Sequence, residues 1–222
     1  MNIAVSFLPF LMLISLLLRQ EDPYKNNREK MVKQQIENRD VKDEAVLKAM
    51  RSVKRHLFVP QGNVSEAYSD QPLPIGFGQT ISQPYIVAYM TEVLEIGTGS
   101  GYQAAVLAEI VKEMYTVEII PELGNTANER LKKLGYKNIF VKVADGYNGW
   151  KEHAPYDAIV VTAAAEYIPP PLVEQLKENG KMVIPVGSPF MTQMLMLVEK
   201  KGNKIITKSL VPVAFVPFKR NK

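Results

Sequence analysis

The stretch "MTEVLEIGTGSGYQAAVLAEI", residues 90–110, decides the fold, because three glycines alternate with small polar residues in its middle. The apolar run 93–96 before the glycines is typical of a buried strand, and the run 102–111 after them is typical of a helix. Glycine lets a backbone approach a ligand closely and permits positive φ. We therefore expect a strand, a ligand-binding loop and a helix whose N-terminal amides face a carboxylate or phosphate.

Further along the chain, strand-like and helix-like segments alternate. The strand-like segments are 93–97, 113–120, 139–145, 156–164 and 181–187, and the helix-like segments are 102–111, 121–135 and 169–180. This alternation predicts an α/β fold with a doubly wound, mostly parallel sheet, and the last two helices are expected to end at glycine. The final part contains a strand, a Lys-Gly-Asn-Lys turn and further extended residues, so we expect an antiparallel C-terminal edge hairpin.

The part of the chain before the glycine loop is less regular. Residues 30–51 carry apolar side chains at spacings that predict two short amphipathic helices with a break near 38–40. The Pro-rich and Gly-rich stretches that follow predict an ordered loop region or a hairpin. A helix is expected over 84–92, with Ser82 as its N-cap just before Gln83 and Pro84.

The N-terminus forms a separate segment. Residues 2–18 carry no charged side chain, and most of them are Leu, Ile, Phe, Val or Met. The run is short for a membrane span and long enough for a signal-peptide core. An export signal, a single anchor and a start site assigned upstream of the true one are three open interpretations. We treat 1–27 as this apolar segment plus a polar linker, and 28–222 as a single domain.

The composition argues against several functional classes. The chain has no cysteine, which excludes disulfides, thiolate nucleophiles and thiolate metal sites. Its only histidines are His56 and His153, which argues against a histidine-built metal site or a catalytic triad, so we expect no metal. The net charge of +4 is mild and spread along the chain, so nucleic acid is not an expected partner.

The spacing of the glycines separates two kinds of nucleotide-type ligand. The dinucleotide fingerprint is G-x-G-x-x-G/A, whereas this loop reads E-x-G-x-G-x-G, with Tyr102 where the third small residue would stand. The pattern resembles the first motif of S-adenosylmethionine-dependent methyltransferases. The loop residues expected to bind the cofactor are Glu95, Gly97, Thr98, Gly99, Ser100 and Gly101.

Two later strands end in carboxylates that suit the same ligand. Glu118 can accept hydrogen bonds from both ribose hydroxyls, as acidic residues do in nucleotide sites of this architecture, although alone it could be a solvated strand end. Asp145, followed by Gly146, can accept a hydrogen bond from an adenine amino group. Suitable groups at three successive strand ends are more specific than any one of them.

Longer motifs narrow the family. They are "RHLFVP", "DQPLPIGFGQTISQPYIVAYMTE", "ADGYNGW", "PYDAIVVTAAAEYIPPPLVEQLKENGKMVIPVG" and "VAFVPF", and the resemblance that they carry runs from about Arg28 to Phe218. Together they resemble protein-L-isoaspartate O-methyltransferases. The resemblance implies a Rossmann-like methyltransferase fold and S-adenosyl-L-methionine as cofactor. It also implies methyl transfer to the α-carboxyl of L-isoaspartyl residues in damaged proteins and peptides, which initiates their repair.

The resemblance further implies roles for single residues. Thr80 and Ser82 in "QTIS" match active-site positions, where a hydroxyl can orient the substrate carboxylate, although Ser82 could instead only cap a helix. Gln193 matches a position near the cofactor. The positions that match the substrate-binding ones are Ile81, Val213, Phe215, Val216 and Pro217, which could also be an ordinary edge strand. A carboxylate substrate is ionised at neutral pH, so the transfer needs no general base.

Other functions and locations stay open at this point. Another S-adenosylmethionine-dependent methyltransferase, acting on a small molecule or RNA, would share the glycine loop and both carboxylates. A cofactor-binding domain without turnover is a further alternative. We expect a monomeric enzyme. We expect it in the cytoplasm, because S-adenosylmethionine is made in the cytosol. Export, or membrane contact through residues 2–18 retained as an anchor, is the alternative.

One departure from the family lies between "MTE" and "VLEIG". The family places a longer connector there, whereas this chain passes directly from Glu92 to Val93. Even short connections between packed elements usually take about 2–6 residues. We therefore expect either a helix that unwinds from about Val87 or a first strand that is shortened at its start.

Overall fold

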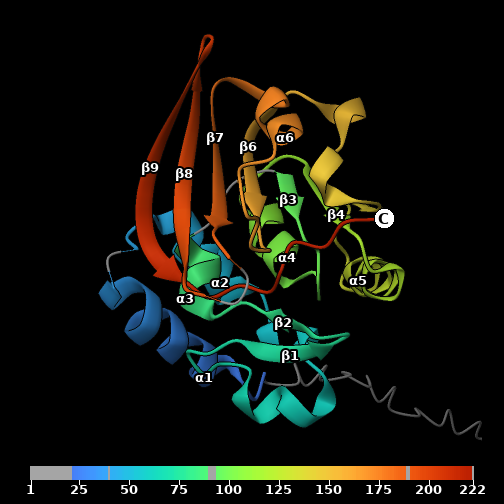
Figure 1. Ribbon diagram of the computed structural model, residues 1–222. Coiled ribbons are helices and arrows are strands. Elements are labelled where there is room, and N and C mark those ends of the chain that lie inside the picture. Colours follow the sequence, from blue (N-terminus) through green and yellow to red (C-terminus); the bar gives the residue numbers. More distant parts are fainter. Residues whose placement is uncertain (1–21, 40, 90–93, 189–190, 222) are drawn as a thin grey trace, which may run out of the picture.

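A seven-stranded sheet forms the centre of the computed structural model, which describes residues 22–39, 41–89, 94–188 and 191–221 (Figure 1). The strand order is β5-β4-β3-β6-β7-β8-β9. The strands are β3 (Leu94–Ile96), β4 (Met114–Glu118), β5 (Ile139–Val143), β6 (Tyr156–Val161), β7 (Leu176–Val186), β8 (Gln193–Lys201) and β9 (Lys204–Val213).

The directions of these strands confirm the predicted fold class. The five strands β3 to β7 are parallel to one another, whereas β8 is antiparallel to β7 and β9 is antiparallel to β8. Chain order runs outward in both directions from the β3–β6 pair, so the strand order reverses there. In open parallel sheets, ligands bind at the carboxyl ends of the strands beside such a reversal.

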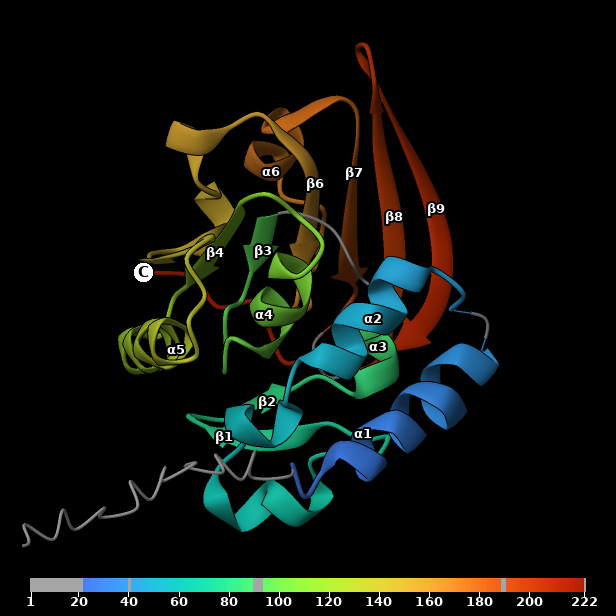
Figure 2. The same ribbon diagram turned by 180° about the vertical axis from the view of Figure 1, so that it is seen from behind.

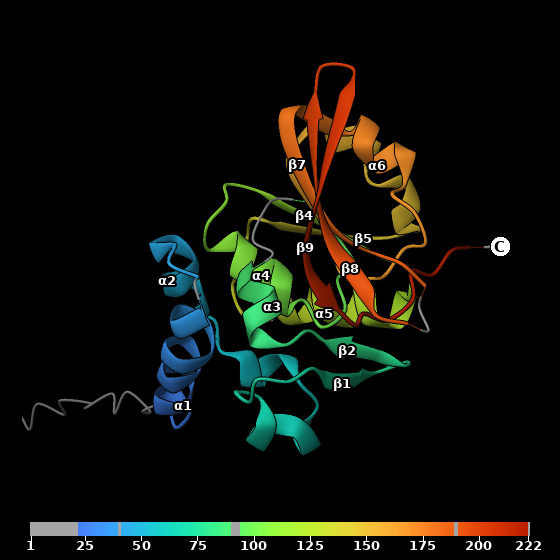
Figure 3. The ribbon, with the colours of Figure 1, turned by 60° about the vertical axis from the view of Figure 1, so that its left-hand side comes forward.

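The C-terminal edge of the sheet is the predicted antiparallel hairpin. The tip of the β8–β9 hairpin projects beyond the rest of the sheet (Figure 3). Along β9, the first six residues are exposed, among them Lys204, Ile205, Ile206 and Lys208. Strand β9 therefore presents an open, largely solvated edge.

Helices connect the parallel strands, and the first two of them lie where the sequence predicts them. They are α4 (Tyr102–Ala108), α5 (Pro121–Lys133) and α6 (Pro170–Glu174), with the short turns η5 (Gly146–Asn148) and η6 (Lys151–His153). Helix α4 ends three residues before the predicted bound, and α5 is followed by Gly135 at φ +90°, as expected of a glycine C-cap.

The predicted helix over 169–180 is wrong in its second half. Helix α6 ends at Glu174, and β7 already begins at Leu176, which pairs with Tyr156. The register between β6 and β7 then shifts, and Asn179 takes a positive φ of 62°. Pairing with β6 satisfies backbone groups that the local sequence would have placed in a helix, so tertiary context overrides propensity here.

Short helices and a hairpin precede the sheet and pack beside it. They are α1 (Lys25–Lys30), η1 (Met31–Ile36), η2 (Glu37–Arg39), α2 (Glu44–Ser52), η3 (Arg55–Phe58), η4 (Gln61–Glu66), β1 (Leu73–Gly76), β2 (Gln79–Ile81) and α3 (Pro84–Tyr89). Figure 2 shows α2, α3 and α4 together on one side of the sheet, and buried side chains of α2, α3 and α4 share one apolar core. The two predicted helices and the hairpin are thereby confirmed.

Two expectations about α3 change. The helix begins at Pro84, and no described backbone N–H donates to the Ser82 hydroxyl, so the predicted Ser82 cap is absent. The helix continues through Val87 to Tyr89, so it does not unwind at Val87. The direct passage from Glu92 to Val93 lies outside the described residues, as does the apolar segment 2–18. Among the helices that are described, none has the length and apolar character that crossing a bilayer requires.

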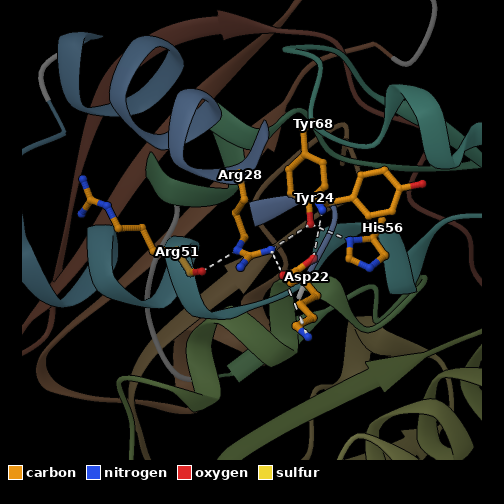
Figure 4. Close-up of polar contacts among 7 residues, drawn as sticks. Asp22, Tyr24, Arg28, Arg51, His56 and Tyr68 are labelled. Carbon is orange, nitrogen blue, oxygen red and sulfur yellow. Dashed lines mark hydrogen bonds and ion pairs between the residues drawn. The ribbon is translucent and has the colours of Figure 1, made fainter. Parts of the chain in front are cut away.

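A polar cluster fastens the start of the described chain to the domain (Figure 4). The Arg28 guanidinium donates to the Asp22 carboxylate at 2.7 Å, and the two side chains are only 8% and 13% exposed. The His56 ring nitrogen Nδ1 lies 2.7 Å from the Tyr68 hydroxyl, and the Tyr24 ring packs 4.4 Å from the His56 ring. His56 and Tyr68, which both follow α2 in the chain, thus pack with one another and with Tyr24, just before α1.

This cluster predicts a large stability loss when Arg28 is removed. Arg28→Ala leaves the nearly buried Asp22 carboxylate without its main partner, which costs about 3 kcal/mol when a buried pair is broken. Guanidinium chloride unfolding measures the change, with the exposed Lys25→Ala as the control, expected within about 0.5 kcal/mol of the parent. A similar small loss for both variants would mean that the pair contributes little.

Candidate active site

The glycine loop lies where the strand order reverses, at the carboxyl end of β3. Gly97, Gly99 and Gly101 all have positive φ, at 105°, 52° and 84°. The Gly97 amide donates to Val117 in β4 at 2.8 Å, and Gly101 closes a turn on Thr98 at 2.8 Å. The loop therefore turns sharply from β3 into α4, as the sequence predicts, and its backbone lines a cavity together with Glu118 and Gly146.

Glu118, the expected ribose ligand, ends β4 at this cavity. Its Oε2 accepts from the Gly99 amide at 2.8 Å, and its Oε1 accepts from the Ile120 amide at 3.0 Å. Each carboxylate oxygen retains further capacity to accept hydrogen bonds. Glu118 thus fixes the middle of the glycine loop, and ribose binding by the same carboxylate stays a prediction.

Glu95 lies beneath the loop in a chain of buried hydroxyls. Its Oε2 accepts from the Thr116 hydroxyl at 2.6 Å, and Thr116 lies 2.7 Å from the Thr98 hydroxyl. Its Oε1 is buried with no partner among the described residues, and Glu95 lines a recess together with Thr98, Ser100 and Ser82. Burial raises the pKa of Glu95 to about 8, the nearby Glu118 charge adds to this, and the Thr116 hydrogen bond opposes it.

Asp145, expected to face adenine, is held by the end of its own chain. Its Oδ1 accepts from the Tyr147 amide at 3.0 Å, and its Oδ2 accepts from Arg220 Nε at 3.0 Å and from the Asn221 amide at 3.2 Å. Burial raises the pKa of Asp145, but these donors together bring it below its ordinary value. Adenine binding by Asp145 stays a prediction, and it would have to share the carboxylate with Arg220.

The C-terminal segment forms part of the cavity wall. The Ala164 amide donates to the Val216 carbonyl and the Phe218 amide donates to the Ala164 carbonyl, both at 2.8 Å. The segment then crosses the carboxyl ends of β3 and β4 (Figure 1), and residues 216–219 line the cavity. The Arg220 guanidinium lies 3.5 Å from the centre of the Tyr147 ring and completes this attachment.

A groove opens beside the cofactor cavity and brings the expected substrate residues together. Thr80, Ser82, Val213, Phe215 and Val216 all line it. No charged side chain is present among its described lining residues. The groove therefore offers hydroxyl donors and apolar walls rather than an ion-pair partner.

Three expected site residues have other surroundings. Ile81 is 4% exposed and packs in the apolar core below the hairpin. Pro217 lines the cofactor cavity rather than the groove. Gln193 is buried, donates to the Ser188 carbonyl at 3.2 Å and accepts from the Phe215 amide at 2.8 Å. Gln193 thus orients the groove-lining segment, and its predicted cofactor contact stays a prediction.

The sequence alone does not single out three side chains that hold the loop. Thr116 of β4 joins Glu95 to Thr98, and Arg130 of α5 donates to the Ser100 carbonyl at 2.7 Å. The Thr162 hydroxyl, just after β6, lies 2.8 Å from the Gly97 carbonyl oxygen. None of these residues stands in the glycine motif, since each reaches the loop from a different element.

The cavity at the glycine loop adjoins the groove, since Thr80, Thr162 and Val216 line both, and the sheet has the strand order of a methyltransferase with a Rossmann-like fold. The family model for protein-L-isoaspartate(D-aspartate) O-methyltransferase matches residues 26–222. The chain belongs to this family.

Curated relatives and solved structures agree with the family model. A protein-L-isoaspartate O-methyltransferase of Opitutus terrae is 57% identical over 206 residues, covering 89% of this chain and 88% of the relative. A relative named protein-L-isoaspartate O-methyltransferase 2, from Syntrophobacter fumaroxidans, is 54% identical over 216 residues, covering 89% and 87%.

Two solved structures share the fold. One, a protein-L-isoaspartate O-methyltransferase, has a TM-score of 0.80 at 28% identity, covering 87% of this chain and 66% of that longer chain. The other is a Plasmodium falciparum chain assigned to the same activity and solved with S-adenosyl-L-homocysteine. It has a TM-score of 0.75 at 28% identity, covering 88% of this chain and all of that one.

The buried position of Glu95 predicts a pH-dependent stability. Its pKa of about 8 in the folded protein lies above the ordinary value of 4.5, so the folded state keeps a proton that the unfolded state loses. Stability should therefore fall as pH rises from about 4.5 to about 8, by up to about 1.4 kcal/mol per pH unit. Glu95→Gln, which cannot ionise, should remove this decline.

Urea unfolding of the cofactor-free protein at pH 5, 6.5 and 8 measures the decline. The exposed Glu129→Gln is the matched control and should keep the parental pH dependence. Equal pH slopes for the Glu95 variant and the parent would show that Glu95 is already ionised in the folded protein.

Proposed function

We propose that this protein transfers the methyl group of S-adenosyl-L-methionine to the α-carboxyl of L-isoaspartyl residues in damaged proteins and peptides. The observation that carries the proposal is the direct junction of the two binding spaces: Thr80 and Thr162 line both the cofactor cavity and the neutral groove. The substrate class follows from family membership and from the names of the relatives.

The residues of the cavity fit the cofactor. Gly97 and Gly146 both line the cavity, and neither place has room for a side chain, since a Cβ on Gly97 would lie 2.3 Å from Thr162 and one on Gly146 would lie 2.5 Å from Ile96. Glu118 lines the cavity with its carboxylate, and Gly97 and Gly99 line it with backbone. Asp145, at the neighbouring strand end, is not among the described lining residues and would have to turn from Arg220 to reach the cofactor. Bound there, S-adenosylmethionine supplies a methyl group already activated by its sulfonium.

The substrate side requires orientation rather than proton transfer. The acceptor carboxylate is ionised at neutral pH, so its oxygen attacks the methyl carbon as the carbon–sulfur bond breaks, and no proton has to leave. Hydroxyls of Thr80 and Ser82 can donate to that carboxylate and set its angle. Correct orientation of two reactants is worth up to about 7–11 kcal/mol of the barrier in favourable cases.

The segment 213–217 supports peptide binding within limits. The Phe215 amide already donates to Gln193, and the Val216 carbonyl already accepts from Ala164. A substrate peptide that pairs with this segment in strand fashion would therefore have to use the neighbouring backbone groups. The β1–β2 hairpin, with Thr80 on β2, closes the opposite side of the groove and is the candidate lid.

The same proposal covers location and assembly. Since S-adenosylmethionine is made in the cytosol, we place the reaction in the cytoplasm, with a monomer as the working unit. Export or anchoring through residues 2–18 is the alternative. Recovery of a form that lacks this segment from an extracellular or periplasmic fraction would support the alternative.

A pair of synthetic peptides tests the activity. One contains a single L-isoaspartyl residue, and its twin contains aspartate at the same position. Transfer of labelled methyl from S-adenosylmethionine should occur to the isoaspartyl peptide and be near background for the twin. Inactivity on both peptides, with intact S-adenosyl-L-homocysteine binding, would contradict the substrate and favour a different methyltransferase or a binding domain.

Ser82 provides a sharper prediction within this function. Ser82→Ala removes a donor to a charged acceptor, worth about 1.5–3 kcal/mol, so kcat/KM for the isoaspartyl peptide should fall roughly 10- to 100-fold. Affinity for S-adenosyl-L-homocysteine, measured by calorimetry, should stay within about twofold, because binding of the product cofactor does not need that donor. The exposed Thr207→Ala on β9 is the control, and normal turnover by Ser82→Ala would remove Ser82 from the active site.

A further inference from the structure

Thr162 occupies the point where the sheet meets the glycine loop. It directly follows β6, and its backbone amide donates to the Ile96 carbonyl at 2.9 Å, which extends the pairing of β6 with β3 by one step. Its hydroxyl oxygen lies 3.0 Å from the same carbonyl oxygen and 2.8 Å from the carbonyl oxygen of Gly97. The backbone bond alone would continue the sheet, so the hydroxyl contact is additional.

The Thr162 hydroxyl is a hydrogen-bond partner of the Gly97 carbonyl oxygen. In the described part of the chain, the Gly97 carbonyl oxygen accepts a hydrogen bond from Thr162 alone. Gly97 has a φ of +105°, and a Cβ there would come within 2.3 Å of the Thr162 hydroxyl oxygen. The hydroxyl therefore fills the space that the missing side chain leaves, and it fixes the first peptide of the loop.

Thr162 also lies at the meeting point of every space that the reaction uses. It lines the cofactor cavity, the substrate groove and the recess above Glu95, and among the described lining residues only Thr80 does the same. Thr80 belongs to strand β2 of the hairpin, whereas Thr162 directly follows β6 of the central sheet. The passage from cofactor to acceptor thus runs between a hairpin residue and a sheet residue.

We propose that Thr162 is a positioning residue for the methyl transfer. Its hydroxyl holds the Gly97 carbonyl, and through it the first turn of the loop, in the orientation that aims the cofactor at the groove. The inference rests on the proposed function, and it assigns to Thr162 no direct part in bond making. Displacing reacting groups by about 1 Å can cost on the order of a hundredfold in rate, so a single loop hydrogen bond can matter at this place.

Two variants separate the hydroxyl from the shape of the side chain. Thr162→Val keeps the branched shape and loses the hydroxyl, whereas Thr162→Ser keeps the hydroxyl and loses the methyl group. For Thr162→Val we expect kcat about tenfold or more below the parent, and KM for the isoaspartyl peptide within about twofold. S-adenosyl-L-homocysteine should bind about 3- to 10-fold more weakly, as expected for one lost hydrogen bond. Thr162→Ser should restore both quantities to within about threefold of the parent.

Calorimetry and thermal melting accompany the kinetics, and Thr207→Val on β9 is the matched control. Parental kcat and parental cofactor-product affinity in Thr162→Val would overturn the inference. Equal losses in the Val and Ser variants would also overturn it, because the methyl group rather than the hydroxyl would then matter. If the parent itself fails to methylate the peptide, the proposed function fails, and the calorimetric comparison still decides whether Thr162 positions the loop.

Discussion

The reversal of strand order between β3 and β6 is the constraint on which the rest of the molecule depends. Because β3 continues to β4 on one side and β6 continues to β7 on the other, the connections that leave the carboxyl ends of β3 and β6 diverge. The glycine loop, Glu118, Asp145 and Thr162 all follow strands at this edge of the sheet. Both binding spaces therefore derive from one topological event.

The loop itself is held from three sides before any ligand arrives. The Glu118 carboxylate accepts a hydrogen bond from the Gly99 amide. The Arg130 guanidinium donates to the Ser100 carbonyl, and the Thr162 hydroxyl donates to the Gly97 carbonyl. A backbone that is fixed in advance does not have to reorganise as the positive charge on sulfur and the negative charge on oxygen are lost, which is how preorganised groups lower a barrier. Burial raises the pKa of the Glu95 carboxyl beneath this loop, so the predicted loss of stability with rising pH would arise beside the site of the chemistry.

Local patterns in the sequence predicted the fold more completely than they predicted the contacts of the site. Strand and helix periodicity predicted the parallel sheet, and the glycine spacing predicted the loop, because both depend on neighbouring residues. The early start of β7 could not be predicted, since Leu176 becomes a strand residue only by pairing with Tyr156. Likewise, nothing near Asp145 in sequence announces its bond to Arg220, which is 75 residues away. The sequence motifs therefore predict the residues of the loop but not the distant side chains that hold the loop in place.

The exposed lysines of β9 have a consequence for an enzyme that handles damaged chains. An open sheet edge is a template on which an unpaired strand of another chain can add. Lys204 and Lys208 place positive charge along that edge, and a strand docking there would have to desolvate it. The sheet can thus keep an open edge at β9 with less risk that a substrate chain binds there instead of in the groove.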